Sequence, residues 1–294
     1  MAILNGINTK LRGSIGQYTF QRLNGQTVAK EKIEKKAIPV RTLSQMLRRV
    51  RWANLVNMYQ AFEGTLHPSF ESKDPRVSDY NMFMQANINS SNVAISKEEA
   101  VQGACVVAPY QITRGQLPGV MVSIDSSHHA VTDIAVGGLA AIGASTTLKA
   151  FSDAIIQNNP TWRNGDQLSL YVAIQTVDGV SGMPRVEMQA IEVTLDTSDE
   201  DTLLEDIVGQ NVYDVQDGML RYKSPLIGGI ACVHSRKVNG KTIVSTQRFV
   251  VDNPTLAQYT TQAAFDTAIQ SYGGVNKEQF LTPNVDNVYA PTNP

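Results

Sequence analysis

Cys232 and His234 are the pair in this sequence best placed for nucleophilic chemistry. They stand two residues apart in the apolar run GGIACVHSRKV. On a strand they would project from the same face, where an imidazole can activate a thiol. No third group is placed to orient His234, and strand alternation alone explains both residues. We therefore favour a structural role for this pair over catalysis.

Three further patterns contain residue types that bind metals or phosphate, but each lacks part of the motif that such a site needs. His128 and His129 are adjacent, so on a strand they would point to opposite faces, and no third metal ligand has suitable spacing. The segment GLAAIGAS at 138–145 has the glycine spacing of a phosphate loop, but Ala144 replaces the lysine and no strand-to-loop-to-helix entry is predicted there. The acidic run 196–206 lacks the glycine and alternating oxygen ligands of a calcium loop.

The acidic run keeps two interpretations, an exposed connection or a counterpart for basic residues of another copy. Together these patterns predict no catalytic residue, no cofactor and no metal site, and a protein that is not an enzyme. Zinc spacing, an aromatic RNA-binding strand motif and a helix-turn-helix pattern are also missing from the sequence.

The clearest local element is a β-hairpin at residues 17–33. Asn24-Gly25 supplies the two left-handed positions of a type I′ turn, and strand-like runs flank it. Gly13 and Gly16 allow the preceding chain to bend. Because an isolated hairpin is marginally stable in water, this arm must pair or pack elsewhere.

An amphipathic helix is predicted to follow at residues 42–62. Pro39 and Thr42 mark its start. Its apolar stripe at helical spacing comprises Leu43, Met46, Leu47, Val50 and Ala53. Its other side carries Arg48, Arg49 and Arg51, with Trp52 beside them. This basic side is interpreted as a solvated face or as a binding surface.

Two short helices and a β-rich region are predicted next. Ser78 opens the helix SDYNMFMQANI, and Ser96 and Glu99 have capping-box spacing. From residue 104 the pattern changes to short strands, ACVVAP and GVMVSI. We place the main boundary near residues 90–103.

The β-rich region contains one long helix and several strands. Leu148, Phe151 and Ile155 mark a helix ending near Pro160, and a strongly alternating strand covers 168–175. The strand PRVEMQAIEVTL changes phase after Ala190, which predicts a bulge or bend. A hairpin is predicted at 227–251, followed by a helix from Pro254 to Gly273 and a tail.

Composition supports a predominantly β protein with an uneven charge. The chain has 294 residues, 42% hydrophobic content, 18% charged residues and ten Tyr. Residues 1–51 carry eleven Lys/Arg against two Glu, whereas the remainder carries 14 basic and 25 acidic residues. This asymmetry is interpreted either as solvated faces or as a basic arm that binds nucleic acid or docks on the acidic face of another copy.

Cellular location is predicted from cysteine use and apolar segments. Cys105 and Cys232 lie in apolar surroundings and are expected to be buried free thiols. The N-terminus lacks the pattern of a signal peptide, and no apolar stretch approaches the roughly 18 residues that span a membrane. We expect synthesis in a reducing cytoplasm and no membrane partner.

Several segments together resemble one protein family. GSIGQYTFQRLNGQTVAKEK followed by RTLSQMLRRVRWANL resembles the opening of small structural proteins of Bacteroidales phages, and SDYNMFMQANI resembles that group's Tyr-Asn-x-Phe-x-x-x-Asn segment. APYQITRGQLP resembles its strand and turn, and HSRKVNGKTIVSTQRFVV and SYGG resemble its C-terminal hairpin and stop. The sequence is thus similar to the ring (collar or tail-barrel) proteins of crAss-like phages and to related uncharacterised Bacteroidales phage-type proteins.

The resemblance implies a virion component that multimerises around the portal–tail axis, made in the cytoplasm of a bacterial host, with no catalytic residues to carry over. Its expected partners are other copies of itself and portal, neighbouring ring or tail proteins. A capsid-associated or nucleic-acid-binding protein is the alternative, and DNA is a less favoured partner of the basic arm. The expected subunit-interface residues are Tyr18, Phe20, Arg22, Arg48, Arg49 and Arg51.

The predicted fold class is α+β: an N-terminal β-hairpin arm and helices, then a mainly antiparallel, sandwich-like β body with a C-terminal helix. The predicted divisions are a basic hairpin arm at 1–36, a helical region at 37–103, a β-rich body at 104–273 and a C-terminal tail at 274–294.

Overall fold

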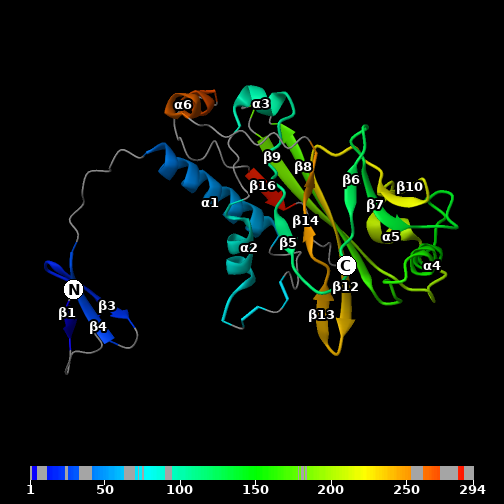
Figure 1. Cartoon of the computed structure of the whole chain (residues 1–294), viewed down its shortest axis with the longest axis horizontal. Helices are drawn as coiled ribbons and strands as arrows, with labels where there is room; N and C mark the ends of the chain where they lie inside the picture. The colour runs from blue at the N-terminus through cyan, green and yellow to red at the C-terminus, as the bar shows by residue number, and fades with distance from the viewer. Residues whose placement is uncertain are drawn as a thin grey trace. The chain divides into compact units, whose positions relative to one another are not determined.

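The fold is α+β, as predicted, and the chain divides into two compact units, Met1–Thr42 and Leu43–Pro294. The computed structural model describes residues 2–4, 12–23, 26–32, 42–62, 70–71, 73–74, 76–89, 95–177, 179, 182, 184–252, 261–271 and 284–287. Each unit is described by itself below (Figure 1).

The first unit is a four-stranded antiparallel sheet with the order β1-β4-β3-β2. Its strands are β1 (Ala2–Leu4), β2 (Gly13–Ile15), β3 (Tyr18–Leu23) and β4 (Gln26–Glu31). The predicted hairpin is confirmed, because β3 and β4 pair in register up to Leu23 and Gln26. Its turn, positions 24–25, lies outside the described residues. A second two-residue connection, Gly16-Gln17, joins β2 to β3, with Gly16 at φ +59°.

Helix α1 (Leu43–Phe62) opens the second unit, where the sequence predicted it. Leu43, Leu47 and Ala53 of the predicted stripe are half-buried, Val50 is buried, and the side chain of Met46 lies outside the described residues. Full burial begins at Val50 and continues along the later turns, at Leu55, Met58, Ala61 and Phe62. The apolar stripe therefore meets the core through the C-terminal half of the helix.

Helices α2 (Asp79–Asn87) and α3 (Lys97–Val101) begin at the caps read from the sequence. The hydroxyl of Ser78 accepts a hydrogen bond from the Asn81 amide at 3.2 Å. Ser96 and Glu99 form both bonds of the capping box. These interactions satisfy amides that a helix start would otherwise leave without partners.

A mainly antiparallel sheet forms the middle of the second unit. Its order is β13-β12-β8-β9-β16, with β15 also paired to β12. Its strands are β8 (Gln167–Val177), β9 (Pro184–Thr194), β12 (Gly228–Val238), β13 (Lys241–Val244), β15 (Val250–Val251) and β16 (Asn284–Asn287). The predicted turn between β12 and β13 is present, with Asn239 at φ +50° and Gly240 at φ +75°.

Two cores cover opposite faces of this sheet. On one face, Tyr171, Ala173 and Val233 pack with α1, α2 and the segment 104–112. On the other face, Leu170, Val172 and further residues pack with a second sheet and with α4 (Leu148–Asn158) (Figure 1). The second sheet has the order β10-β11-β7-β6, and its strands are β6 (Val122–Ile124), β7 (Ala130–Ala135), β10 (Tyr213–Gln216) and β11 (Met219–Tyr222).

The remaining described elements are short. They are β5 (Gln111–Thr113), β14 (Gln247–Arg248), α5 (Leu204–Val208) and α6 (Gln262–Gln270). Strand β14 pairs with β5, so the predicted strand at 241–251 is divided among β13, β14 and β15. Residues on both sides of the predicted boundary at 90–103 contribute to the first core.

The predicted strand at 104–109 is wrong, although all of residues 104–108 are buried. Two of their backbone groups bond to a side chain instead of to a neighbouring strand. The buried Gln175 amide accepts from the Val106 N–H at 2.7 Å and donates to the Ala104 carbonyl at 2.7 Å. An apolar run therefore lies against the sheet without joining it.

Of the bulge or bend predicted in β9, the bulge is wrong. Pairing between β8 and β9 runs without a register shift from Gln167–Thr194 to Val177–Pro184. The phase change at Ala190 arises because Val186, Met188 and Ala190 face the first core, whereas Val193 faces the second. The two covering layers are staggered along the strand.

The C-terminal region is described in part. Helix α6 lies within the predicted helix, but its proposed stripe at Phe265, Ile269 and Tyr272 lies outside the side chains that are described. In the predicted tail, β16 pairs in parallel with β9, from Asn284–Arg185 to Asn287–Met188.

Substituting Gly228 by alanine tests how tightly β12 and β8 approach. Gly228 has φ +142°, and an added Cβ would lie 1.9 Å from the Ala173 carbonyl oxygen. Gly138 has φ +95° with no atom within 4 Å of such a Cβ. We expect Gly228→Ala to lower the free energy of unfolding by at least ~3 kcal/mol and Gly138→Ala by ~1 kcal/mol, in urea titrations followed by circular dichroism. If the two variants lose the same unfolding free energy, the close approach of β12 to β8 at Gly228 is contradicted.

Candidate functional site

Three of the expected interface residues, Tyr18, Phe20 and Arg22, occupy alternate positions of β3. Tyr18 and Phe20 project from the same face of the N-terminal sheet, because side chains at alternate positions of a strand do so. Tyr18 is 55% exposed and Phe20 is half-buried. The side chain of Arg22 lies outside the described residues.

Sequence reasoning missed Ile15, which lies directly opposite Tyr18 across the β2–β3 turn. Its side chain is 63% exposed. The Gly16-Gln17 pair was the signal that predicts this turn, since glycine readily adopts a positive φ. Ile15 and Tyr18 therefore form an exposed apolar pair at the tip of the sheet.

The other three expected residues lie on α1, in the second unit. Arg48 and Arg49 are exposed, whereas Arg51 is half-buried. Trp52 is 51% exposed and stands four residues after Arg48 and three after Arg49, which places all three on one helix face. The six expected residues thus fall into two groups on two units.

The acidic run forms the connection between β9 and α5. Asp196 and Asp199 accept hydrogen bonds from Ser198 and Thr202, and these bonds lower the pKa of each carboxyl. Glu200 pairs with Lys149. The interpretation as a connection is confirmed for residues 196–203, and three carboxylates of the run, Glu200, Asp201 and Asp206, are exposed.

Cys232 and His234 do share a strand face, but the structure supplies a third group that the sequence did not predict. This group is Asp166, which directly precedes β8. Its Oδ2 atom lies 2.8 Å from the Nε2 atom of His234. The ring of Trp162 stacks on His234 with the centroids 3.9 Å apart. Arg236 donates to both carboxylate oxygens of Asp166, at 2.6 and 2.7 Å.

The contacts among Trp162, Asp166, His234 and Arg236 connect the 159–166 turn to β12. His234 and Asp166 are each 1% exposed. Burial raises the pKa of the Asp166 carboxyl, but the hydrogen bonds from Arg236 and His234 outweigh it and hold the pKa at about 2. Burial also raises the pKa of the Cys232 thiol, which disfavours the thiolate that a nucleophile needs. The geometry fits a buried structural ion pair.

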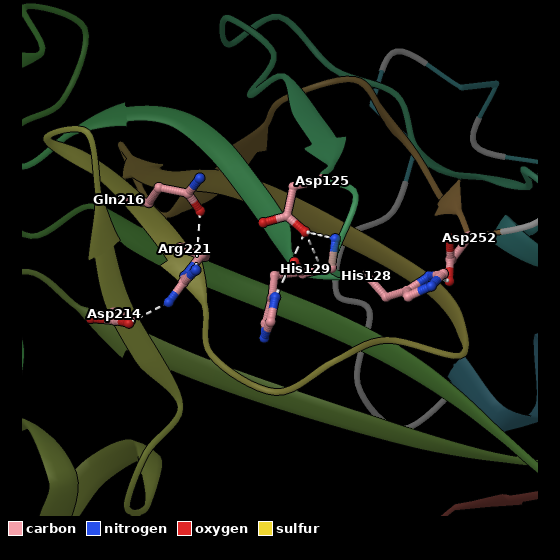
Figure 2. Close-up of polar contacts among 8 residues, drawn as sticks. Asp125, His128, His129, Asp214, Gln216, Arg221 and Asp252 are labelled. Atoms are coloured by element: carbon pink, nitrogen blue, oxygen red, sulfur yellow. Dashed lines mark hydrogen bonds and ion pairs between the residues drawn. The ribbon is translucent and has the colours of Figure 1, made fainter.

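His128 and His129 lie in the turn between β6 and β7, not on a strand. His128 has φ +64°, and its Nδ1 atom lies 2.6 Å from Oδ2 of Asp252. The His129 amide donates to Asp125 at 3.0 Å, and its ring points away from that of His128 (Figure 2). Among the described residues, no cluster of three metal-ligating side chains occurs.

Arg221 lies beside this turn on the outer face of the second sheet (Figure 2). It donates to Asp214 at 2.5 Å and to Gln216 at 3.1 Å, and both partners belong to the neighbouring strand β10. Burial raises the pKa of Asp214, but hydrogen bonds from the Val215 amide and Arg221 lower it overall. The arrangement is a cross-strand polar ladder.

The glycine-spaced segment 138–145 does lie between a strand, β7, and a helix, α4, contrary to the sequence expectation. Phosphate binding at such a place uses the first amides of the helix. Here the Leu148 amide donates to the Thr202 carbonyl, and the Lys149 amide to the Asp199 carbonyl. The Ala150 amide donates to Thr147. The protein itself occupies the groups that a phosphate would need.

Comparison with known proteins identifies no relative of this chain. No family model matches the sequence, and neither a curated protein nor a solved structure matches it significantly. Within the described residues, no helix is long and apolar enough to cross a membrane.

Replacing Asp166 by asparagine tests the buried ion pair. Because the folded-state pKa lies below the value near 3.9 of free Asp, the carboxylate stabilises the fold above about pH 4 and this stabilisation is lost as the pH falls towards 2. We expect Asp166→Asn to lower the free energy of unfolding by at least ~2 kcal/mol at pH 7. The difference from the wild-type protein should shrink by ~2 kcal/mol between pH 4 and pH 2.

Urea titrations at a series of pH values measure this difference. Asp201→Asn is the matched control, since this carboxylate is exposed, and its difference from wild type should stay within ~0.5 kcal/mol. If the difference in unfolding free energy between the wild-type protein and Asp166→Asn does not change with pH, the buried ion pair of Asp166 is contradicted.

Proposed function

We propose that the chain is a structural virion protein, a subunit of a homo-oligomeric ring in the portal–tail (collar or tail-barrel) region of a tailed phage. In this proposal the N-terminal arm and the C-terminal tail make contacts with neighbouring subunits. The partners are other copies of the chain and portal, neighbouring ring or tail proteins.

The observation that carries the proposal is the charged, separate N-terminal unit with its exposed apolar pair. Residues 1–42 hold eight basic and two acidic residues, a formal charge of +6. Residues 43–294 hold 17 basic and 25 acidic residues, a formal charge of −8. Opposite charges on an arm and a body favour head-to-tail contacts between copies, and such contacts close into a ring when the rotation permits.

The tail supports the same kind of assembly. Strand β16 pairs in parallel with the outer edge of β9, in a sheet that is otherwise antiparallel. An open sheet edge accepts an extended segment through main-chain hydrogen bonds. Such an edge suits a tail that docks on its own body or on a neighbouring subunit.

The family resemblance rests on segments that form definite elements in the structure. The resembling N-terminal segment corresponds to the β3–β4 hairpin and α1, and the resembling C-terminal segment corresponds to β12 and β13. The hairpin and the helix of this pattern are therefore elements of the structure, and the linker between them lies outside the described residues. This agreement supports the proposed virion role.

Nucleic-acid binding is the second candidate, because one surface fits it. Arg48, Arg49 and Trp52 lie on one exposed helix face. Basic side chains beside an aromatic ring are the groups that bind single-stranded nucleic acid through phosphate contacts and base stacking.

Removing residues 1–36 tests the ring proposal. The full-length chain is expected to form a closed oligomer, and the truncated chain a folded monomer, because the arm contacts are lost while both cores of the second unit remain. Light scattering after size-exclusion chromatography measures the mass, and circular dichroism verifies the fold. If the truncated chain forms oligomers with the same number of subunits as the full-length chain, the arm is not needed for assembly.

The double variant Arg48→Ala, Arg49→Ala tests the second candidate. If the α1 surface binds nucleic acid, fluorescence anisotropy with a labelled single-stranded oligonucleotide at low salt should show binding that weakens at least tenfold in the variant and falls steeply with salt. Lys237→Ala, Lys241→Ala is the charge-matched control, because both residues are exposed on the β12–β13 hairpin. Absence of binding by the wild-type chain at low salt would reject this candidate.

A further inference from the structure

The N-terminal sheet is too small to be stable by itself. It is a single layer of four strands with three to six residues each, and residues 1–42 contain no cysteine that could cross-link it. Sheets of this size need packing, a disulfide or a partner. Another surface must therefore cover part of it.

Burial within this sheet is uneven along its length. Thr27 and Val28, neighbours on β4, are 0% and 5% exposed, and they project from opposite faces. At the other end, the β2–β3 tip leaves Ile15 and Tyr18 largely exposed. Among the residues of this sheet whose burial is described, the exposed large apolar side chains are those of the tip.

The two faces of the tip differ in chemistry. Ile15 and Tyr18 lie on one face, and Phe20 is the next residue of β3 on that face. The opposite face carries polar pairs, Ser14 with Thr19 at 3.0 Å and Lys30 with Gln21 at 3.0 Å. At the tip, the Ile15–Tyr18 face is therefore the one better suited to a desolvated contact, whereas the buried Val28 lies on the other face farther along the sheet.

A carboxylate and a cation lie beside the apolar pair. Glu31 lies directly opposite Tyr18 on β4, and its side chain is exposed. The Lys32 amide donates to the Gln17 carbonyl at 2.5 Å, which holds Lys32 next to the turn, and its side chain is exposed. An apolar centre containing a tyrosine, with charge at its rim, is the composition of an interface hot spot.

We propose that the Ile15–Tyr18 tip docks on the acidic body of a second copy of this chain. The partner is assigned from charge complementarity, +6 on residues 1–42 against −8 on residues 43–294. The apolar pair supplies most of the affinity and the charges set the orientation. The inference rests on the proposed ring function and names the contact that holds neighbouring subunits together.

The double variant Ile15→Ser, Tyr18→Ser of the full chain tests the contact by sedimentation equilibrium. Removing two hot-spot side chains should raise the dissociation constant between subunits about 100-fold. Ser14→Ala, Gln21→Ala alters the opposite face of the same strands and is expected to assemble as the wild type does. Assembly of the Ile15/Tyr18 variant with wild-type affinity would overturn the inference and leave the ring proposal standing.

A cross-linking measurement covers the case in which the double variant fails to fold its arm. A photoreactive phenylalanine analogue replaces Tyr18, and ¹⁴N-labelled and ¹⁵N-labelled chains are mixed in urea and refolded together before irradiation. Mixed-isotope peptides joining position 18 to residues 43–294 are the expected product. Cross-links confined to one isotope assign the tip to its own body and overturn the inference, whereas a wild-type chain that is monomeric at all concentrations overturns the ring proposal itself.

Discussion

Burial of the central strands on both faces is the constraint on which the second unit depends. Every side chain of β8 from Leu168 to Ala173 is buried, so the sheet requires an apolar layer on each side. Helices α1 and α2 provide one layer, and the second sheet with α4 provides the other. Gly229 shows how close this packing is, because a Cβ there would lie 2.9 Å from a methyl carbon of Val107. The irregular segment 104–110 is thus fixed by the sheet it covers.

Local signals predicted local structure well. The caps at Ser78 and Ser96 and the Asn239-Gly240 turn depend on hydrogen bonds and backbone angles within a few residues, which a sequence pattern records directly. The apolar run at 104–109 was misassigned because its hydrogen-bond partner, Gln175, stands about 70 residues away. The phase change in β9 was misassigned because alternation does not reveal that two layers end at different points along one strand.

The candidate sites show the same limit. Alternate spacing placed Tyr18 and Phe20 on one face, but their neighbour Ile15 depends on a turn at Gly16 that was treated as a bend. Asp166 was missed because it lies 68 residues from His234 and follows no strand periodicity with it. Its position is set by the pairing of β8 with β12, which is a property of the folded sheet. A site assembled from distant strands is therefore visible only once their register is known.

The two cysteines lie in different cores. Cys105 belongs to the layer formed with α1 and α2, and Cys232 belongs to the layer formed with the second sheet. Both thiols are fully buried, and burial raises the pKa of Cys105 to about 12. Neither sulfur can react with a water-soluble reagent until its own layer separates from the central sheet. The rates at which the two thiols react with such a reagent therefore report the opening of the two layers separately. Equal rates indicate that the layers open together, and different rates indicate that one layer opens before the other.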